Sequence, residues 1–171
     1  MAEFCGLWQG GPRFAQAEHF RLGTDCVLLA DFVNTASARR GIDLGCASGA
    51  ISLLLLVRSP ALHMTGLELV PEAAELARAN MAENALTERA DMICGDIRRV
   101  RELFSAGSFD LAAANPPYFP VGHGKSASSA PRAAARGELS CTLEDICAAA
   151  QWLLRTGGSL SLVHRPERLA D

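Results

Sequence analysis

The chain has 171 residues, of which 49% are hydrophobic, and a formal net charge of −3. This length allows one compact domain with a buried core, and the slightly acidic balance excludes a broad basic surface for nucleic acid, so any such contact must be local. The longest apolar run, residues 51–57, is far shorter than the roughly 20 residues that span a bilayer. The first residues lack the basic and apolar regions of a secretory signal. We therefore expect a soluble cytoplasmic protein with no membrane contact.

The predicted elements alternate between short apolar strands and helices. In chain order they are a strand at residues 41–44, a helix at 50–58, a strand at 62–69, a helix from Pro71 to about residue 84, and a strand at 90–94. A short helix at 97–104, a strand at 109–114, a helix at 142–155 closed by residues 156–158, and a strand at 159–164 follow. Residues 120–137 are small, polar and rich in glycine and proline, so we expect a long loop there.

Strands that are apolar on both faces and alternate with helices predict an α/β fold. We expect a Rossmann-like doubly wound parallel sheet with helices on both faces. Such sheets bind ligands at the carboxyl ends of their strands. The residues that follow each predicted strand are therefore the candidates for a site.

The first strand leads into Asp43-Leu44-Gly45-Cys46-Ala47-Ser48-Gly49. Two glycines four residues apart allow a sharp turn from strand to helix and let a ligand lie against bare backbone. Ala47 takes the middle position of the dinucleotide pattern G-x-G-x-x-G, so this stretch matches that fingerprint poorly. Taken alone, the stretch is equally consistent with an ordinary turn between a strand and a helix.

The next two strands end in acidic residues. Glu68 closes the second strand, where a carboxylate can accept both hydroxyls of a ribose, or can simply be a solvated strand end. Asp96 and Ile97 follow the third strand, where they could contact an adenine ring, although Asp96 could equally cap a helix. Together with the glycines, these residues predict a site for an adenosine, and S-adenosylmethionine fits better than NAD.

The fourth strand ends in Asn115-Pro116-Pro117-Tyr118. Prolines stiffen the backbone and remove N–H donors. The Asn115 side-chain carbonyl and the Pro116 main-chain carbonyl can then converge on one planar amino group and accept both of its hydrogens. Tyr118 offers a face on which a base can stack, a contact worth about 1–3 kcal/mol.

In this order, D-x-G-x-x-x-G, a strand-end glutamate, G-D-I and N-P-P-Y resemble the class I S-adenosylmethionine-dependent methyltransferases that modify amino nitrogens. Nearly the whole chain resembles the bacterial tRNA(Val) (adenine-37-N6)-methyltransferase family. The supporting stretches are residues 20–25, 27–30, 115–119, 135–138 and 163–169. Because several amino methyltransferases share N-P-P-Y, this motif indicates the chemistry better than the substrate.

The resemblance implies direct methyl transfer from S-adenosylmethionine to adenine N6 in the anticodon loop of a tRNA, with no metal. It also implies which residues bind the cofactor and which bind the target base. These are Asp43, Gly45 and Gly49 for the methionine part, Glu68 for the ribose, Asp96 and Ile97 for the adenine, and Asn115, Pro116, Pro117 and Tyr118 for the target base. Asp25 would cap the helix that covers the cofactor. Five basic residues could meet tRNA phosphates, although each taken singly is also consistent with a solvated surface charge: Lys125, Arg132, Arg136, Arg165 and Arg168.

The chain departs from the family in three ways. Cys46-Ala47-Ser48 is an uncommon filling for the glycine loop, and Gly137 replaces a histidine. Full members continue beyond the fifth strand, so we expect residues 1–171 to be a single methyltransferase domain that is incomplete at its C-terminus. The exposed fifth strand would then favour marginal stability or self-association; the oligomeric state is not fixed by the sequence.

Other functions share parts of this pattern. N-P-P-Y also serves N5-glutamine methylation of release factors and guanine-N2 methylation of ribosomal RNA. A nicotinamide-dependent oxidoreductase is a further alternative on a similar sheet, which Ala47 opposes. A non-catalytic module that binds S-adenosylmethionine or RNA without turnover is the alternative outside enzymes.

The six cysteines form no C-x-x-C pair and have no histidine at zinc-finger spacing. We therefore predict neither a disulfide framework nor a metal site, and expect the thiols to be small buried groups.

Overall fold

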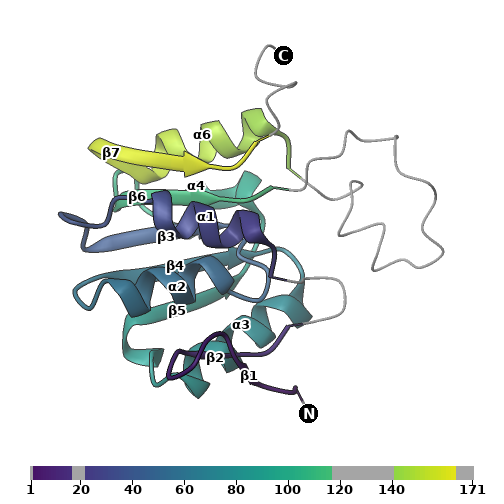
Figure 1. The fold of residues 1–171 in the computed structure, drawn as a ribbon. Coiled ribbons are helices and arrows are strands. Elements are labelled where there is room, and N and C mark those ends of the chain that lie inside the picture. Colours follow the sequence, from purple (N-terminus) through teal and green to yellow (C-terminus); the bar gives the residue numbers. More distant parts are fainter. Residues whose placement is uncertain (1, 17–21, 117–140, 165–171) are drawn as a thin grey trace.

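Five parallel strands form the main sheet of the computed structural model, which describes residues 2–16, 22–116 and 141–164 (Figure 1). Their order across the sheet is β5-β4-β3-β6-β7. The strands are β3 (Arg40–Leu44), β4 (His63–Glu68), β5 (Ala90–Cys94), β6 (Phe109–Ala114) and β7 (Leu154–Leu162). The chain runs outward from β3 to β5, returns to the other side of β3 with β6, and then runs outward again. This confirms the predicted doubly wound parallel sheet.

Helices cover both faces of this sheet. They are α1 (Thr24–Phe32), α2 (Ala50–Arg58), α3 (Pro71–Glu83), the one-turn α4 (Val100–Leu103) and α6 (Leu143–Leu153), with short 3-10 turns η1 (Thr87–Arg89) and η2 (Ile97–Arg99). Figure 1 shows α1 and α2 in front of the strands. Among the described residues, no helix has the length and apolarity needed to cross a membrane.

Each face of the sheet has its own apolar cluster. On one face, Leu53 and Leu56 of α2 and Met81 of α3 pack with Met64 and Leu111 of the strands. On the other, strand residues pack with α6 and α4; the cluster includes Ile42, Leu44, Phe109, Ile146 and Leu153. Residues 41–44 of β3 are buried between the two clusters, and Asp43 is the charged residue among them.

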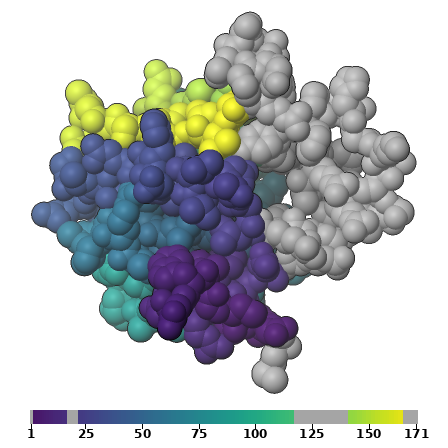
Figure 2. All heavy atoms as spheres, in the orientation of Figure 1, coloured from purple at the N-terminus to yellow at the C-terminus, as the bar shows by residue number. Residues whose placement is uncertain are grey.

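A small antiparallel hairpin, β1 (Cys5–Gly6) and β2 (Arg13–Phe14), precedes the main sheet and was not expected from the sequence. Figure 2 shows the purple N-terminal segment lying against the blue and teal part of the chain. Asn84 joins the two, since its Oδ1 accepts from Arg13 N at 2.8 Å and its Nδ2 donates to Arg13 O at 2.6 Å. Two-residue strands are too short to be read from an alternating pattern.

Most predicted boundaries are confirmed, and the end of α6 is the main difference. The helix begins with a capping box in which Thr142 and Asp145 exchange hydrogen bonds of 3.2 and 2.8 Å. It ends at Leu153, whereas we expected residue 155, and β7 begins at Leu154, whereas we expected residue 159.

The reason for this difference is an irregularity in β7. Leu154 pairs with Phe109 and Ser159 with Leu111, so β7 advances five residues while β6 advances two. Gly157 has a φ of +79°, which glycine adopts without strain. Gly157 and Gly158 therefore lie in a bulge inside β7. Our prediction that they close the helix was wrong.

The cysteine prediction was partly wrong. Cys46 is buried and Cys26 and Cys141 are half-buried, but the other three, Cys5, Cys94 and Cys147, are exposed.

At the amino ends of β3, β6 and β7, Asp110 joins three strands. Its Oδ2 accepts from the backbone N–H groups of Arg39 and Arg40 at 2.7 and 2.9 Å, and its Oδ1 accepts from Arg155 Nε at 2.5 Å. The Arg155 guanidinium and then the two backbone donors lower the pKa of Asp110 from its ordinary 3.8 to about 2.

We predict that Asp110→Asn lowers the free energy of unfolding by about 1–3 kcal/mol at pH 7, because charged hydrogen bonds are lost. Since the pKa is lowered in the folded state, the contribution of Asp110 is fully present above about pH 4 and is lost as the pH falls toward 2. Urea unfolding of both proteins at pH 7 and pH 3 measures this. Asp31→Asn, at an exposed carboxylate, is the control. Equal stabilities at pH 7 would contradict the prediction.

Candidate functional site

The register of the sheet places three predicted site residues side by side. Leu44 of β3 pairs with Leu67 of β4 and with Ala114 of β6. The next residue on each strand is therefore Gly45, Glu68 or Asn115. These three residues form one row at the carboxyl edge, at the point where the strand order reverses and where ligands bind in such sheets.

The loop after β3 has an unusual backbone. Gly45, Ala47 and Gly49 have φ values of +77°, +48° and +81°, in the left-handed region that is unfavourable for residues with a side chain. The N–H groups of Gly45 and Cys46 donate to Leu67 O at 2.8 and 3.1 Å, which holds the loop against β4. The left-handed Ala47 is thus kept in place by the contacts of its neighbours.

The two glycines have different surroundings. Among the described residues, a Cβ at Gly45 would have only Ile97 Cδ1 near it, at 4.0 Å, so the backbone there is open. A Cβ at Gly49 would lie 3.1 Å from Met81 Cε and 3.2 Å from Ala77 Cβ on α3. Gly45 thus offers the bare backbone that the sequence suggested, whereas Gly49 lets the loop pack against α3.

Asp43, two residues before Gly45, is fully buried. Its Oδ2 accepts from Ser52 Oγ at 2.9 Å and from Ser52 N at 3.3 Å, while its Oδ1 has no hydrogen-bond partner among the described residues. Burial, and to a smaller extent the charge of Glu68, raises the pKa of Asp43 from 3.8 to about 7. A buried acceptor without a donor costs free energy in the ligand-free chain and suits a ligand that carries a cation or N–H group.

Glu68 is buried and accepts one hydrogen bond on each oxygen. Oε2 accepts from Ala47 N and Oε1 from Val70 N, both at 2.8 Å. The carboxylate thus ties the glycine loop to the start of α3 and is not a solvated strand end. Each carboxylate oxygen has a second lone pair, so hydroxyl donors can still be accommodated.

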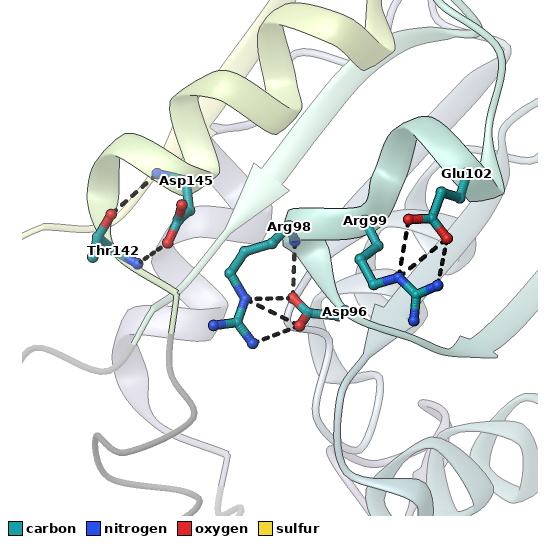
Figure 3. Close-up of polar contacts among 6 residues, drawn as sticks. All are labelled: Asp96, Arg98, Arg99, Glu102, Thr142 and Asp145. Atoms are coloured by element: carbon teal, nitrogen blue, oxygen red, sulfur yellow. Dashed lines mark hydrogen bonds and ion pairs between the residues drawn. The ribbon is translucent and has the colours of Figure 1, made fainter.

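Asp96 is the N-cap of η2, which was one of the two roles that the sequence left open (Figure 3). Its Oδ1 accepts from Arg98 N at 2.9 Å, and the Arg98 guanidinium binds both carboxylate oxygens at 2.5–3.0 Å. The hydrogen bonds from the Arg98 side chain are the main cause of the lowered pKa of Asp96. Any adenine contact of Asp96 therefore has to coexist with Arg98, which the sequence did not single out.

Asn115 lies half-buried at the end of β6 and contacts the first turn of α1. Its Nδ2 lies 3.0 Å from Asp25 Oδ2 and 3.2 Å from Cys26 Sγ.

The expected capping role of Asp25 is wrong, since Gly23 is the N-cap and Asp25 is the second residue of the helix. Pro116 follows Asn115 in the described part of the chain. Pro117, Tyr118 and all five predicted phosphate contacts lie outside it.

Asn80 supports the site and was missed in the sequence. It is fully buried on α3, where its Nδ2 donates to Ser48 O at 2.8 Å and to Ala15 O at 2.9 Å, and its Oδ1 accepts from Ala15 N at 2.7 Å. It thereby links the glycine loop to the N-terminal segment. The sequence did contain a signal for it. The other buried residues of α3 are alanines and a methionine, so an amide side chain at a buried position of this helix is unusual.

Within the described ranges, no group of three or more His, Cys, Asp or Glu side chains could hold a metal ion.

Comparison with known proteins gives consistent matches. Residues 17–169 match the family model described as the methyltransferase small domain. The chain is 36% identical over 160 residues to the tRNA1(Val) (adenine(37)-N6)-methyltransferase of Porphyromonas gingivalis, and 37% identical over 152 residues to that of Aeromonas hydrophila. Each match covers 88% of this chain and 61% of the relative, so the chain spans about three fifths of their length.

Among solved structures, the fold matches a predicted O-methyltransferase from Agrobacterium tumefaciens with a TM-score of 0.66 and 27% sequence identity. The match covers 85% of this chain and 64% of that protein.

We predict that Gly49→Ala lowers the free energy of unfolding by about 2–4 kcal/mol, because a left-handed φ is combined with a steric conflict against α3. Gly10→Ala is the matched control, since Gly10 has a φ of +74° and no atom of the described residues lies within 4 Å of the added Cβ. It should cost only about 1–2 kcal/mol. Chemical unfolding of both variants measures the difference, and equal losses would show that α3 does not restrict residue 49.

We predict that Asp43→Asn removes a pH dependence of stability in the ligand-free protein. The pKa of Asp43 is raised to about 7 in the folded state, so the folded chain binds more protons than the unfolded chain between about pH 4 and 7. Asp43 therefore lowers the stability of the wild type as the pH rises through this range. Urea unfolding at pH 5 and pH 8 should show the wild type losing stability relative to the variant; parallel pH profiles would contradict this.

Proposed function

The chain belongs to the methyltransferase small domain family, whose model matches residues 17–169, and we propose that it transfers a methyl group from S-adenosylmethionine to adenine N6 in the anticodon loop of a tRNA. The observation that carries this proposal is the row formed by Glu68, Gly45 and Asn115 at the carboxyl edge of β4, β3 and β6. It joins a candidate nucleoside site directly to a candidate amine site.

The residues present fit S-adenosylmethionine. Oδ1 of the fully buried Asp43 has no hydrogen-bond partner in the described part of the chain, and the backbone is open two residues further on, at Gly45, so a cationic amino acid moiety can be bound here. Glu68 can accept ribose hydroxyls with its remaining lone pairs. Ile97, whose side chain approaches Gly45, provides an apolar surface for the adenine. When bound, S-adenosylmethionine supplies a methyl group activated by a positively charged sulfur.

On the substrate side, Asn115 and Pro116 accept the two hydrogens of the target amine with a side-chain and a main-chain carbonyl. These acceptors orient the nitrogen and stabilise the positive charge that develops on it. The nitrogen becomes acidic only after methylation, so its proton can pass to solvent without a strong base. Stacking of the base on Tyr118 belongs to the same proposal.

The tRNA substrate is supported by the names of the relatives, which describe enzymes that act on adenine 37 of tRNA1(Val). With a net charge of −3, the contact with RNA has to be local, and a base in a single-stranded loop costs least to splay out. Methylation of a release-factor glutamine or of a guanine N2 would use the same Asn115 and Pro116 acceptors, so the substrate has to be tested separately from the chemistry.

We predict that the two halves of the site can be separated by mutation. Asn115→Ala should retain S-adenosylmethionine affinity within about threefold but lose methyl transfer by roughly 100-fold or more, as when one preorganised polar contact is removed. Asp43→Asn should weaken S-adenosylmethionine binding by about tenfold or more, since it removes a buried charge facing the ligand. Calorimetry measures binding, and mass spectrometry of an unmodified tRNA transcript measures N6-methyladenosine.

Asn34→Ala, at an exposed asparagine, controls for surface effects. A transcript with guanine at position 37 and a release-factor fragment test the substrate. Methylation of the fragment in preference to tRNA would contradict the adenine proposal, and full turnover by Asn115→Ala would contradict the assigned amine site.

A further inference from the structure

We propose that Asp25 is a positioning residue that acts through Asn115. The first turn of α1 holds the Asn115 amide in the orientation that presents its oxygen, and not its nitrogen, to the target amine. The inference rests on the proposed function, because it assigns the orientation of the amine acceptor named there. It differs from the helix-capping role that the sequence suggested for Asp25.

The contact joins residues that lie 90 positions apart in the chain. Asn115 Nδ2 donates to Asp25 Oδ2 at 3.0 Å, and Cys26 Sγ lies 3.2 Å from the same nitrogen. The side chains of Asp25, Cys26 and Asn115 are all partly buried. The amino group of Asn115 therefore faces two potential acceptors on one helix.

The chemistry of the two groups selects one amide orientation. An ionised carboxylate only accepts hydrogen bonds, whereas an amide has a donor side and an acceptor side. Rotation of the Asn115 amide by half a turn would bring its oxygen against the Asp25 carboxylate and would place the NH2 group where the oxygen had been. The negative charge of Asp25 disfavours that state, and it polarises the amide so that its oxygen becomes a stronger acceptor.

The helix that carries Asp25 is firmly anchored. Leu29 and Ala30 are buried in the apolar cluster between α1 and α2. At the other end of α1, the Arg58 side chain of α2 donates to Asp31 O at 2.8 Å and also donates to Val33 O. Side chains presented by an anchored helix hold a site more closely than side chains on a loop. Asp25 is thus well placed to orient a residue on another element.

A double-mutant cycle between positions 25 and 115 tests the inference. Asp25→Asn keeps the size of the side chain but no longer selects one amide orientation, so kcat should fall by about tenfold while the KM for S-adenosylmethionine stays within about threefold. Asn115→Asp places two carboxylates together and should cost at least about 100-fold in kcat.

The double variant Asp25→Asn with Asn115→Asp restores a donor opposite an acceptor. It should recover at least about tenfold over Asn115→Asp alone, because contacting residues are not additive. If Asp25 only stabilises α1, the two losses should multiply, and that result would overturn the inference.

A second measurement does not depend on methyl transfer. In nitrogen-15 spectra of the ligand-free protein, the Asn115 side-chain amide, assigned by its absence in Asn115→Ala, should exchange slowly and shift on Asp25→Ala. Asp31→Asn, on the same helix at an exposed carboxylate, should leave it unchanged. An amide signal insensitive to Asp25→Ala would overturn the inference. A sensitive signal in a chain that methylates no tRNA would support the contact and contradict the proposed function alone.

Discussion

The parallel pairing of β3 with both β4 and β6 is the constraint on which the site depends. Because Leu44 pairs with Leu67 and with Ala114, three candidate site residues that are far apart in the sequence, Gly45, Glu68 and Asn115, lie in one row at the edge of the sheet. A slip of one residue in either pairing would turn the whole strand over and would bury the wrong face. The apolar clusters on both sides of the sheet therefore fix the position of the site as well as the stability of the fold.

The same loop shows a conflict between stability and binding. Asp43 is a buried carboxyl with one oxygen that no described residue hydrogen-bonds, and Ala47 has a left-handed backbone. Each feature is unfavourable for the chain without a ligand. Both are held by surrounding contacts, namely Ser52 on the carboxyl and Glu68 on the Ala47 N–H. Such locally unfavourable features are expected where a protein is shaped for a ligand rather than for its own stability.

The sequence predicted the order of elements and most of their boundaries, because apolar runs and glycines report directly on parallel strands and on the turns that follow them. It also predicted that the residues at the carboxyl ends of β3, β4 and β6 lie together at one edge of the sheet. It could not predict the partner of Asn115, since no local pattern links that residue to Asp25. It likewise missed Asn80 and Arg98, whose importance comes from contacts made only in three dimensions. The bulge in β7 was misread for a related reason, because a glycine pair ends a helix as readily as it bends a strand.

The contacts that complete the site also have a consequence for the order of folding. Asn80 binds Ala15 across 65 positions of sequence, Asn84 binds Arg13 across 71, and Asn115 binds Asp25 across 90. Contacts between distant residues require closure of long loops, which opposes their early formation. We therefore expect the sheet to assemble from β3 to β5 first, with the N-terminal segment and α1 docking last. Pulsed hydrogen exchange during refolding would show this as late protection of residues 13–15 and of α1. The competence of the site would then depend on a final docking step rather than on formation of the core.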